Sequence, residues 1–323
     1  MQKKILILGS NGFIGQNIKK IFINKESETN SIKNKYYIYG TNRKEVDILE
    51  KEKLDNFFKK IKPEIVINCS GIVGSSLYNL GMNDYEIFSK NILMQMNILD
   101  CCEKYKVQKI VFLSTYRIFG ENIHEKYNET NIHSNYDMNI NSGYLLSKKM
   151  LHLQLDLFFK HNPNINYVCL LLPNIFGKYD SFIANGRIVP AIIRKMEDAK
   201  KKETDLIIHS NPLNQINLIY VEDLFPIIEK CLQDDDINEN IIIFNEKGTW
   251  TLDKLVNSLK KAMGFEKEII FTENTSNNNS NSNIMKPDIS KFKYFFKDYQ
   301  FKNLENSIKE TLEHFYILET GMS

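Results

Sequence analysis

The sequence has few cysteines, and none stands in a pattern typical of a metal site or a disulfide-bonded scaffold. The five are an odd number, with no CxxC pair and no Cys/His ligand spacing: Cys69, Cys101, Cys102, Cys169 and Cys231. We therefore expect reduced thiols, as in a cytoplasmic protein, and no bound metal.

Long apolar runs are also missing. The longest, at residues 109–113 and 167–173, fall far short of the ~20 residues that cross a bilayer, and no leader pattern opens the chain. Charge of one sign is not in excess either, because 42 Lys and Arg residues stand against 40 Asp and Glu residues, a net charge of +2. We therefore expect neither a membrane nor a nucleic-acid partner.

What the chain does contain is an alternation of short apolar runs and helical patterns. Strands are predicted at 4–8, 36–39, 65–68, 110–113 and 167–172, and helices at 16–22, 51–60, 84–105 and 143–160. This alternation predicts right-handed crossovers and a doubly wound parallel sheet, the Rossmann α/β fold. We assign residues 1–175 to a dinucleotide-binding domain, to which later segments return.

After residue 175 the pattern loosens. Helices are predicted at 188–198, 221–232 and 252–263, with one strand at 206–209. We interpret residues 176–323 mainly as a smaller α/β lobe for the substrate. The total length of 323 residues, with 42% hydrophobic and 25% charged, suits two such globular units.

A glycine-rich turn joins the first strand to the first helix. In residues 9–15 (GSNGFIG) the first glycine permits a tight turn, the second lets a diphosphate approach, and the third lets helix and strand pack closely. The predicted coenzyme-binding residues here are Gly9, Asn11, Gly12, Phe13, Ile14 and Gly15.

The end of the second strand indicates which dinucleotide binds. An acidic residue there favours NAD, whereas an arginine accommodates the 2′-phosphate of NADP. The chain has Asn42, Arg43 and Lys44, with no acid before Glu45. We therefore predict NADPH as the coenzyme, with Asn42 and Arg43 at its adenosine end.

A third set of residues supplies the chemistry. Thr115 ends the fourth strand, and Tyr144 and Lys148 follow with the i, i+4 spacing that puts them on one helix face. A phenol exchanges a proton poorly near neutral pH until a cation lowers its pKa, and Lys148 is the cation that the spacing offers. We predict these three residues as the catalytic set.

With these motifs the chain resembles the extended short-chain dehydrogenase/reductases, that is, the NAD-dependent epimerase/dehydratase family. Further matches are Asp47-Ile48, Asn68 to Gly71 (NCSG), Asn91, Pro173 to Gly177 (PNIFG), Tyr220 to Asp223 (YVED) and Lys286 to Ser290 (KPDIS). The resemblance implies further coenzyme contacts at Asp47, Ile48, Ser70, Gly71, Ile72, Lys148, Pro173, Asn174 and Ile175. It implies substrate contacts at Val73, Thr115, Tyr116, Arg117, Asn174, Arg187, Lys195 and Lys286.

Within the family the chain is most similar to the GDP-L-fucose synthase group, which epimerises a 4-keto sugar beside the ketone and then reduces it. In that group a cysteine and a histidine exchange the protons; here their places hold Arg117 and Arg187. A guanidinium with a pKa above ~12 does not exchange protons at neutral pH. We therefore predict NADPH-dependent reduction of a nucleotide-activated 4-keto-6-deoxy hexose or heptose, GDP-linked, without epimerisation, in bacterial surface polysaccharide synthesis.

Other functions remain open from the sequence. They are a bifunctional epimerase/reductase, an NAD-retaining 4-epimerase, and a dinucleotide sensor without catalysis. Dehydration is disfavoured, because Tyr116 and Arg117 stand where dehydratases carry Asp-Glu.

The predicted helices at 84–105 and 143–160 each carry apolar residues on two faces. A helix that packs only on a sheet needs one apolar stripe. The second stripe predicts a four-helix homodimer interface, the alternative being burial under the smaller lobe.

Overall fold

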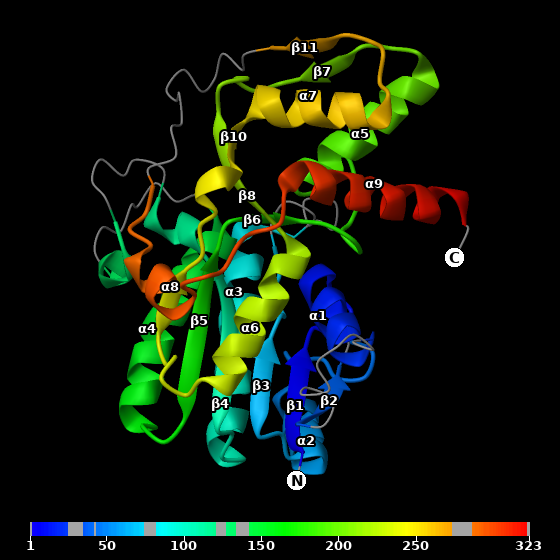
Figure 1. Cartoon of the computed structure of the whole chain (residues 1–323). Coiled ribbons are helices and arrows are strands. Elements are labelled where there is room, and N and C mark those ends of the chain that lie inside the picture. Colours follow the sequence, from blue (N-terminus) through cyan, green and yellow to red (C-terminus); the bar gives the residue numbers. More distant parts are fainter. Residues whose placement is uncertain are drawn as a thin grey trace.

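The computed structural model describes residues 2–24, 35–41, 43–73, 82–120, 127–133, 142–272 and 286–321. A lower lobe holds a parallel sheet between helices, and an upper lobe holds shorter strands and three further helices (Figure 1). Within the described ranges no helix is long and apolar enough to cross a membrane. No three His, Cys, Asp or Glu side chains in these ranges gather as a metal site.

The main sheet has the strand order β2-β1-β3-β4-β5-β9, and all its pairs are parallel. Its strands are β1 (Lys3–Leu8), β2 (Tyr36–Gly40), β3 (Ile65–Asn68), β4 (Lys109–Thr115), β5 (Asn166–Leu172) and β9 (Asn240–Ile242). The chain reverses direction across the sheet between β1 and β3, which is where doubly wound folds bind ligands. The five predicted strands and the Rossmann fold are confirmed.

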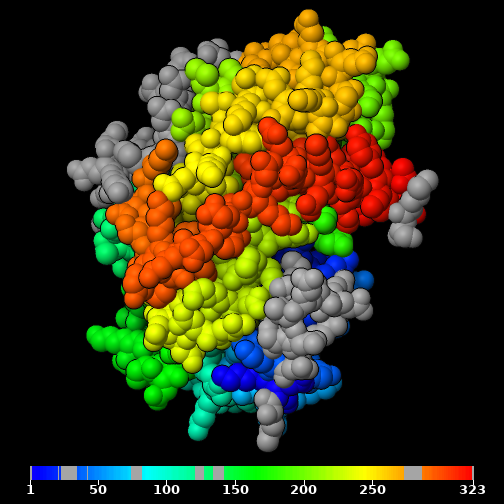
Figure 2. Space-filling model, in the orientation of Figure 1, coloured from blue at the N-terminus to red at the C-terminus, as the bar shows by residue number. Residues whose placement is uncertain are grey.

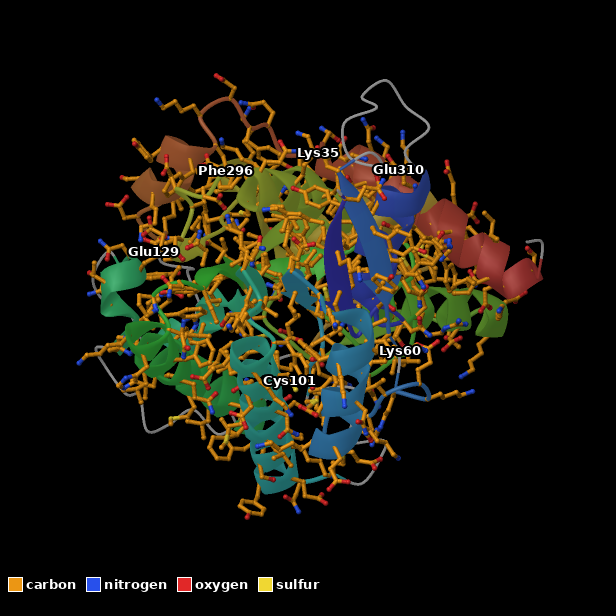
Figure 3. The ribbon with its side chains drawn as sticks, turned by 90° about the horizontal axis from the view of Figure 1, so that it is seen from below. Lys35, Lys60, Cys101, Glu129, Phe296 and Glu310 are labelled. Carbon is orange, nitrogen blue, oxygen red and sulfur yellow. The ribbon has the colours of Figure 1, made fainter. Side chains whose placement is uncertain are left out.

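Helices cover both faces of this sheet because its strands are apolar on both sides. In β1, Ile5 and Ile7 join one core, while Leu6 and Leu8 join the other. The first core includes residues of α1 (Phe13–Asn24) and α6 (Leu224–Gln233). The second includes residues of α2 (Lys51–Ile61), α3 (Asp84–Lys104) and α4 (Gly143–His161). In Figure 3, Lys60 of α2 and Cys101 of α3 lie on the same side of the sheet.

The upper lobe is built from short strands. Its sheets are β10-β8-β6 and β11-β7, from β6 (Asn174–Phe176), β7 (Leu206–Ile208), β8 (Gln215–Tyr220), β10 (Thr249–Thr251) and β11 (Ile269–Phe271). Its helices are α5 (Ile188–Lys202), α7 (Leu252–Met263) and α9 (Leu304–Thr320), and α8 (Ser290–Phe295) lies beside β9. The carboxy-terminal segment crosses the molecule between the two lobes (Figure 2).

Part of the chain after residue 175 differs from the prediction, both in the upper lobe and where the chain returns to the main sheet. The helix expected at 221–232 is a 3-10 turn, Val221–Asp223, followed by α6. The strands β6, β8, β9, β10 and β11 and the helices α8 and α9 were not predicted. Most of these strands have three residues, too few to show a period of two.

Candidate active site

The glycine turn between β1 and α1 forms one wall of the site. Gly9 has a φ of +72°, and a Cβ there would lie 2.9 Å from the Ser70 backbone nitrogen. A Cβ on Gly15 would lie 2.2 Å from the Gly9 carbonyl oxygen, so close packing requires glycine. A Cβ on Gly12 would approach only that oxygen, at 3.3 Å, among the described residues. The space before Gly12, at the amino end of α1, therefore fits a diphosphate.

The turn after β3 forms a second wall. The Asn68 side-chain oxygen accepts hydrogen bonds from the Ser70 backbone nitrogen at 3.0 Å and from its hydroxyl at 2.5 Å. Asn91 of α3 bonds both backbone groups of Ile72, at 2.8 and 2.9 Å. A Cβ on Gly71 would lie 3.9 Å from the Lys148 ammonium. The structure thus brings the predicted residues 70–72 beside Lys148.

The end of β2 lies next to the glycine turn. The Thr41 carbonyl oxygen accepts hydrogen bonds from the Ser10 backbone nitrogen at 3.0 Å and from its hydroxyl at 3.1 Å. Arg43 is 78% exposed, and its Nε lies 3.2 Å from the Asp47 carboxylate. Asn42 lies outside the described residues, and Ile48 is buried. Arg43 therefore lies, largely exposed, just after the end of β2.

Thr115, Tyr144 and Lys148 lie at the carboxyl ends of the central strands. The Lys148 ammonium donates a hydrogen bond of 2.7 Å to the Leu113 carbonyl oxygen of β4 and lies 5.8 Å from the centroid of the Tyr144 ring. The amino ends of α4 and α3 are in close contact, since a Cβ on Gly143 would lie 1.9 Å from the Asp84 carbonyl oxygen. That contact fixes the first turn of α4, and with it Tyr144.

Burial dominates the electrostatics of this group. Burial raises the pKa of Tyr144 to about 12, against which the charges of Arg117 and Arg187 act. Burial also lowers the pKa of Lys148 to about 8. Arg117 and Arg187 thus favour the ionised phenol, and the Lys148 ammonium, the cation that the sequence spacing predicts, lies 5.8 Å from the Tyr144 ring centroid. Tyr116 is itself buried, which raises its pKa to about 12.

A histidine that the sequence did not single out lies behind Lys148. His152 is fully buried, with Nε2 at 3.0 Å from the Ser114 hydroxyl and Nδ1 at 3.0 Å from the Asn240 side-chain oxygen. Burial lowers the pKa of His152 to about 3, so the ring is neutral. This chain of polar contacts joins α4 to β4 and β9, and only the fold brings its members together.

Among the predicted substrate residues, Arg187 has the most specific contacts in the structure. Its guanidinium forms a two-point ion pair with Asp180, whose carboxylate is 1% exposed. Its Cζ also lies 4.5 Å from the centroid of the Phe13 ring in α1. Arg187 therefore spans from the upper lobe to the glycine turn.

The remaining predicted coenzyme and substrate residues have fewer contacts with the glycine turn and the catalytic set. Pro173 and Ile175 are buried at the crossing into the upper lobe, and the Asn174 amide donates to the Asn217 carbonyl oxygen at 3.3 Å. Val73, Lys195 and Lys286 complete the predicted substrate set. Lys195 and Lys286 are exposed, and no hydrogen bond or ion pair among the described residues joins either lysine to the triad.

This geometry can be set beside known proteins. The model of the NAD dependent epimerase/dehydratase family matches residues 5–245. The chain belongs to this family. The family resemblance predicted from the motifs is thereby confirmed, and the parallel sheet and its helices agree with it.

Several members of the family are similar over nearly the whole chain. GDP-L-fucose synthase of Dictyostelium discoideum is 25% identical, covering 97% of this chain and 95% of its own length. A solved GDP-L-fucose synthetase of Naegleria fowleri, bound to NADP, has a TM-score of 0.81 at 20% identity, with 98% of this chain and 94% of that one covered. A GDP-6-OMe-4-keto-L-xylo-heptose reductase of C. jejuni has a TM-score of 0.80 at 18% identity, with 98% of both chains covered. At these identities the structural similarity shows the fold.

Proposed function

We propose that this protein uses NADPH to reduce the C4 ketone of a nucleotide-activated sugar and leaves the neighbouring stereocentres unchanged. The proposal rests on Arg117 and Arg187, which stand where the GDP-L-fucose synthase group carries its proton-exchanging cysteine and histidine, and on the ion pair that holds Arg187 to the buried Asp180. A guanidinium does not exchange protons near neutral pH. Proton abstraction beside a ketone needs a group that does.

The chain's own residues provide the remaining steps of a reduction. Tyr144 is protonated at neutral pH and donates its phenolic proton to the ketone oxygen, while Arg117 and Arg187 stabilise the phenolate that remains. Thr115, at the end of β4, orients that oxygen. Lys148 holds the nicotinamide ribose and stays fixed by the Leu113 carbonyl. The reduced nicotinamide, when bound, supplies the hydride.

The proposed substrate is a GDP-linked 4-keto-6-deoxy hexose or heptose. Support comes from the names of the relatives, two GDP-L-fucose synthases and a GDP-heptose reductase. The exposed Lys195 and Lys286 are proposed to meet its phosphates. The setting we propose is the cytoplasmic synthesis of bacterial surface polysaccharide.

The preference for NADPH rests on Arg43. Its exposed guanidinium lies just after the second strand and forms an ion pair of 3.2 Å with Asp47. An arginine at this place pairs with a 2′-phosphate better than with ribose hydroxyls.

The test is a reduction carried out in D₂O. The enzyme is incubated with NADPH and a GDP-linked 4-keto-6-deoxy sugar, and the product is analysed by NMR beside a reaction without enzyme. We expect one NADPH consumed per product and no deuterium on the carbons that flank C4. Enzyme-dependent deuterium at either carbon would show an epimerising enzyme. Interconversion of C4 epimers without NADPH consumption would show a 4-epimerase. The absence of any turnover is the result expected of a dinucleotide sensor.

We also propose a homodimer through α3 and α4, which pack side by side. Both helices expose large apolar side chains, Tyr85, Leu93 and Met96 on α3 and Leu146, Met150 and Leu157 on α4. A second copy presenting the same faces would cover them in a four-helix arrangement. Light scattering should give twice the chain mass for the wild type and a monomer for Leu157→Glu. A monomeric wild type at micromolar concentration would reject the dimer.

A further inference from the structure

The loop that follows β6 lies along helix α1. The Asn17 amide of α1 donates to the Lys178 carbonyl oxygen at 2.8 Å. The Lys20 ammonium lies 3.9 Å from the centroid of the Tyr179 ring. Arg187, at the far end of the same loop, lies over Phe13. Phe13, Asn17 and Lys20 follow one another at helical spacing, so they lie on one face of α1. The loop after β6 therefore packs against that face.

Arg187 is held in one orientation at the end of this loop. Its Nε and Nη2 bond the two carboxylate oxygens of Asp180, which is buried and also accepts a hydrogen bond from the Ser181 backbone nitrogen at 2.7 Å. That fork uses one edge of the guanidinium, the edge that carries Nε and Nη2. The Arg187 side chain nevertheless remains 37% exposed, so the guanidinium can still meet a ligand.

The glycine turn itself carries no basic side chain. Residues 9–15 read GSNGFIG, and the first basic residue of α1 is Lys19, more than a helical turn further on. A dinucleotide diphosphate carries two negative charges, which backbone N–H groups at a helix start stabilise in part. The guanidinium that lies at this helix start comes from Arg187, stacked on the first residue of α1.

We infer that Arg187 contacts the coenzyme diphosphate, so that the substrate lobe completes the dinucleotide site. The inference rests on the dinucleotide binding in the proposed function. The guanidinium lies over Phe13 at the start of α1, and its charge also acts on the Tyr144 phenol at the reacting end of the site. A dinucleotide that extends from the glycine turn to the phenol passes Arg187 with its diphosphate. Asp180 is then a positioning residue, because it acts through Arg187.

The test measures binding rather than turnover. Dissociation constants for NADP⁺, NAD⁺ and adenosine 2′-monophosphate are determined by calorimetry for the wild type, Arg187→Gln and Arg43→Gln. For Arg187→Gln we expect the constants for NADP⁺ and NAD⁺ to rise by the same factor, about tenfold, and that for the monophosphate to stay unchanged. Arg43→Gln should weaken NADP⁺ and the monophosphate and spare NAD⁺. Lys201→Gln, which removes the same charge at an exposed site, should change none of them.

The outcomes separate this inference from the proposed function. A wild type that binds no dinucleotide rejects the proposed function. Suppose instead that the wild type binds NADP⁺ and that Arg187→Gln binds both dinucleotides as tightly as the wild type does. This result overturns the inference and leaves the proposed function standing. The inference is likewise overturned if Arg187→Gln weakens adenosine 2′-monophosphate as much as it weakens the two dinucleotides. If the Gln variant does not fold, Arg187→Lys, which keeps the charge and loses the fork, should weaken both dinucleotides several-fold, and unchanged binding would overturn the inference.

Discussion

The strands of the main sheet and those of the upper lobe differ in what holds them in place. β1, β4 and β5 have six or seven residues each, and their apolar side chains enter cores on both faces. β6, β7, β10 and β11 have three residues each. In the upper lobe a fully buried amide, Asn217, bonds the Asn245 backbone at 2.8 and 3.2 Å and the Thr249 hydroxyl at 2.8 Å.

This difference between the lobes suggests that the lower lobe carries the reacting groups and that the upper lobe contributes binding residues. Apolar burial fixes the main sheet rigidly, and its strand ends carry the glycine turn and the triad. The upper lobe also buries an apolar core, with Leu255, Val256 and Leu259 of α7 fully buried, and specific polar contacts such as those of Asn217 add to it. We therefore expect changes in the lower lobe to affect chemistry most, and changes in the upper lobe to affect local stability and binding.

The largest effect is expected at the strand ends of the lower lobe. Tyr144→Phe removes only the hydroxyl that we propose as the proton donor, so kcat should fall by roughly 10²–10⁴. Folding and NADP⁺ binding should persist, and both are measured beside steady-state rates. Activity within a few-fold of the wild type would assign the proton donor to another group.

The next effect is one of stability, at Lys148. Burial lowers its pKa from 10.5 to about 8, so at neutral pH the folded chain keeps a charge that burial disfavours. Lys148→Met removes that charge and should raise the free energy of unfolding of the coenzyme-free protein by up to about 3 kcal/mol, while turnover is lost.

The pH dependence of the free energy of unfolding tests whether the buried charge of Lys148 causes this gain in stability. Between pH 8 and 10.5 the unfolded wild type binds more protons than the folded one, so wild-type stability rises with pH and the advantage of Lys148→Met disappears. Lys60→Met, at an exposed position of α2, serves as the control. An advantage that stays constant up to pH 10.5 would point to packing instead of charge.

In the upper lobe the corresponding test is Asn217→Ala. The substitution leaves the buried Asn245 N–H without its partner and removes one of two hydrogen bonds that the Asn245 carbonyl accepts, the other coming from the Gly248 N–H. This should cost about 2 kcal/mol of unfolding free energy. Asn257→Ala, at an exposed position of α7, should change it by less than ~0.5 kcal/mol. Denaturant titration measures both. Equal effects would contradict the view that the polar contacts of Asn217 add to the stability of this lobe.

The two lobes also differ in how far the sequence alone describes them. The glycine turn, the strand-end Thr115 and the pair Tyr144 and Lys148 are local patterns, and each lies where its pattern predicts. The contact of Arg187 with Phe13 joins residues far apart in the chain, with no periodic signal to announce it. The same holds for His152 with Asn240. Such contacts depend on how the loops cross, which is a property of the tertiary fold.

The smallest effect is expected at Arg43, whose side chain is 78% exposed just after the end of β2. Solvent screening weakens an exposed ion pair, so Arg43→Ala should raise the KM for NADPH by about tenfold at most. The KM for NADH should change by less than about twofold, because NADH has no 2′-phosphate for a guanidinium to meet. Lys53→Ala, an exposed change at the start of α2, controls for the lost charge. Equal losses for both coenzymes would mean that Arg43 supports the groove through Asp47 and does not select the coenzyme.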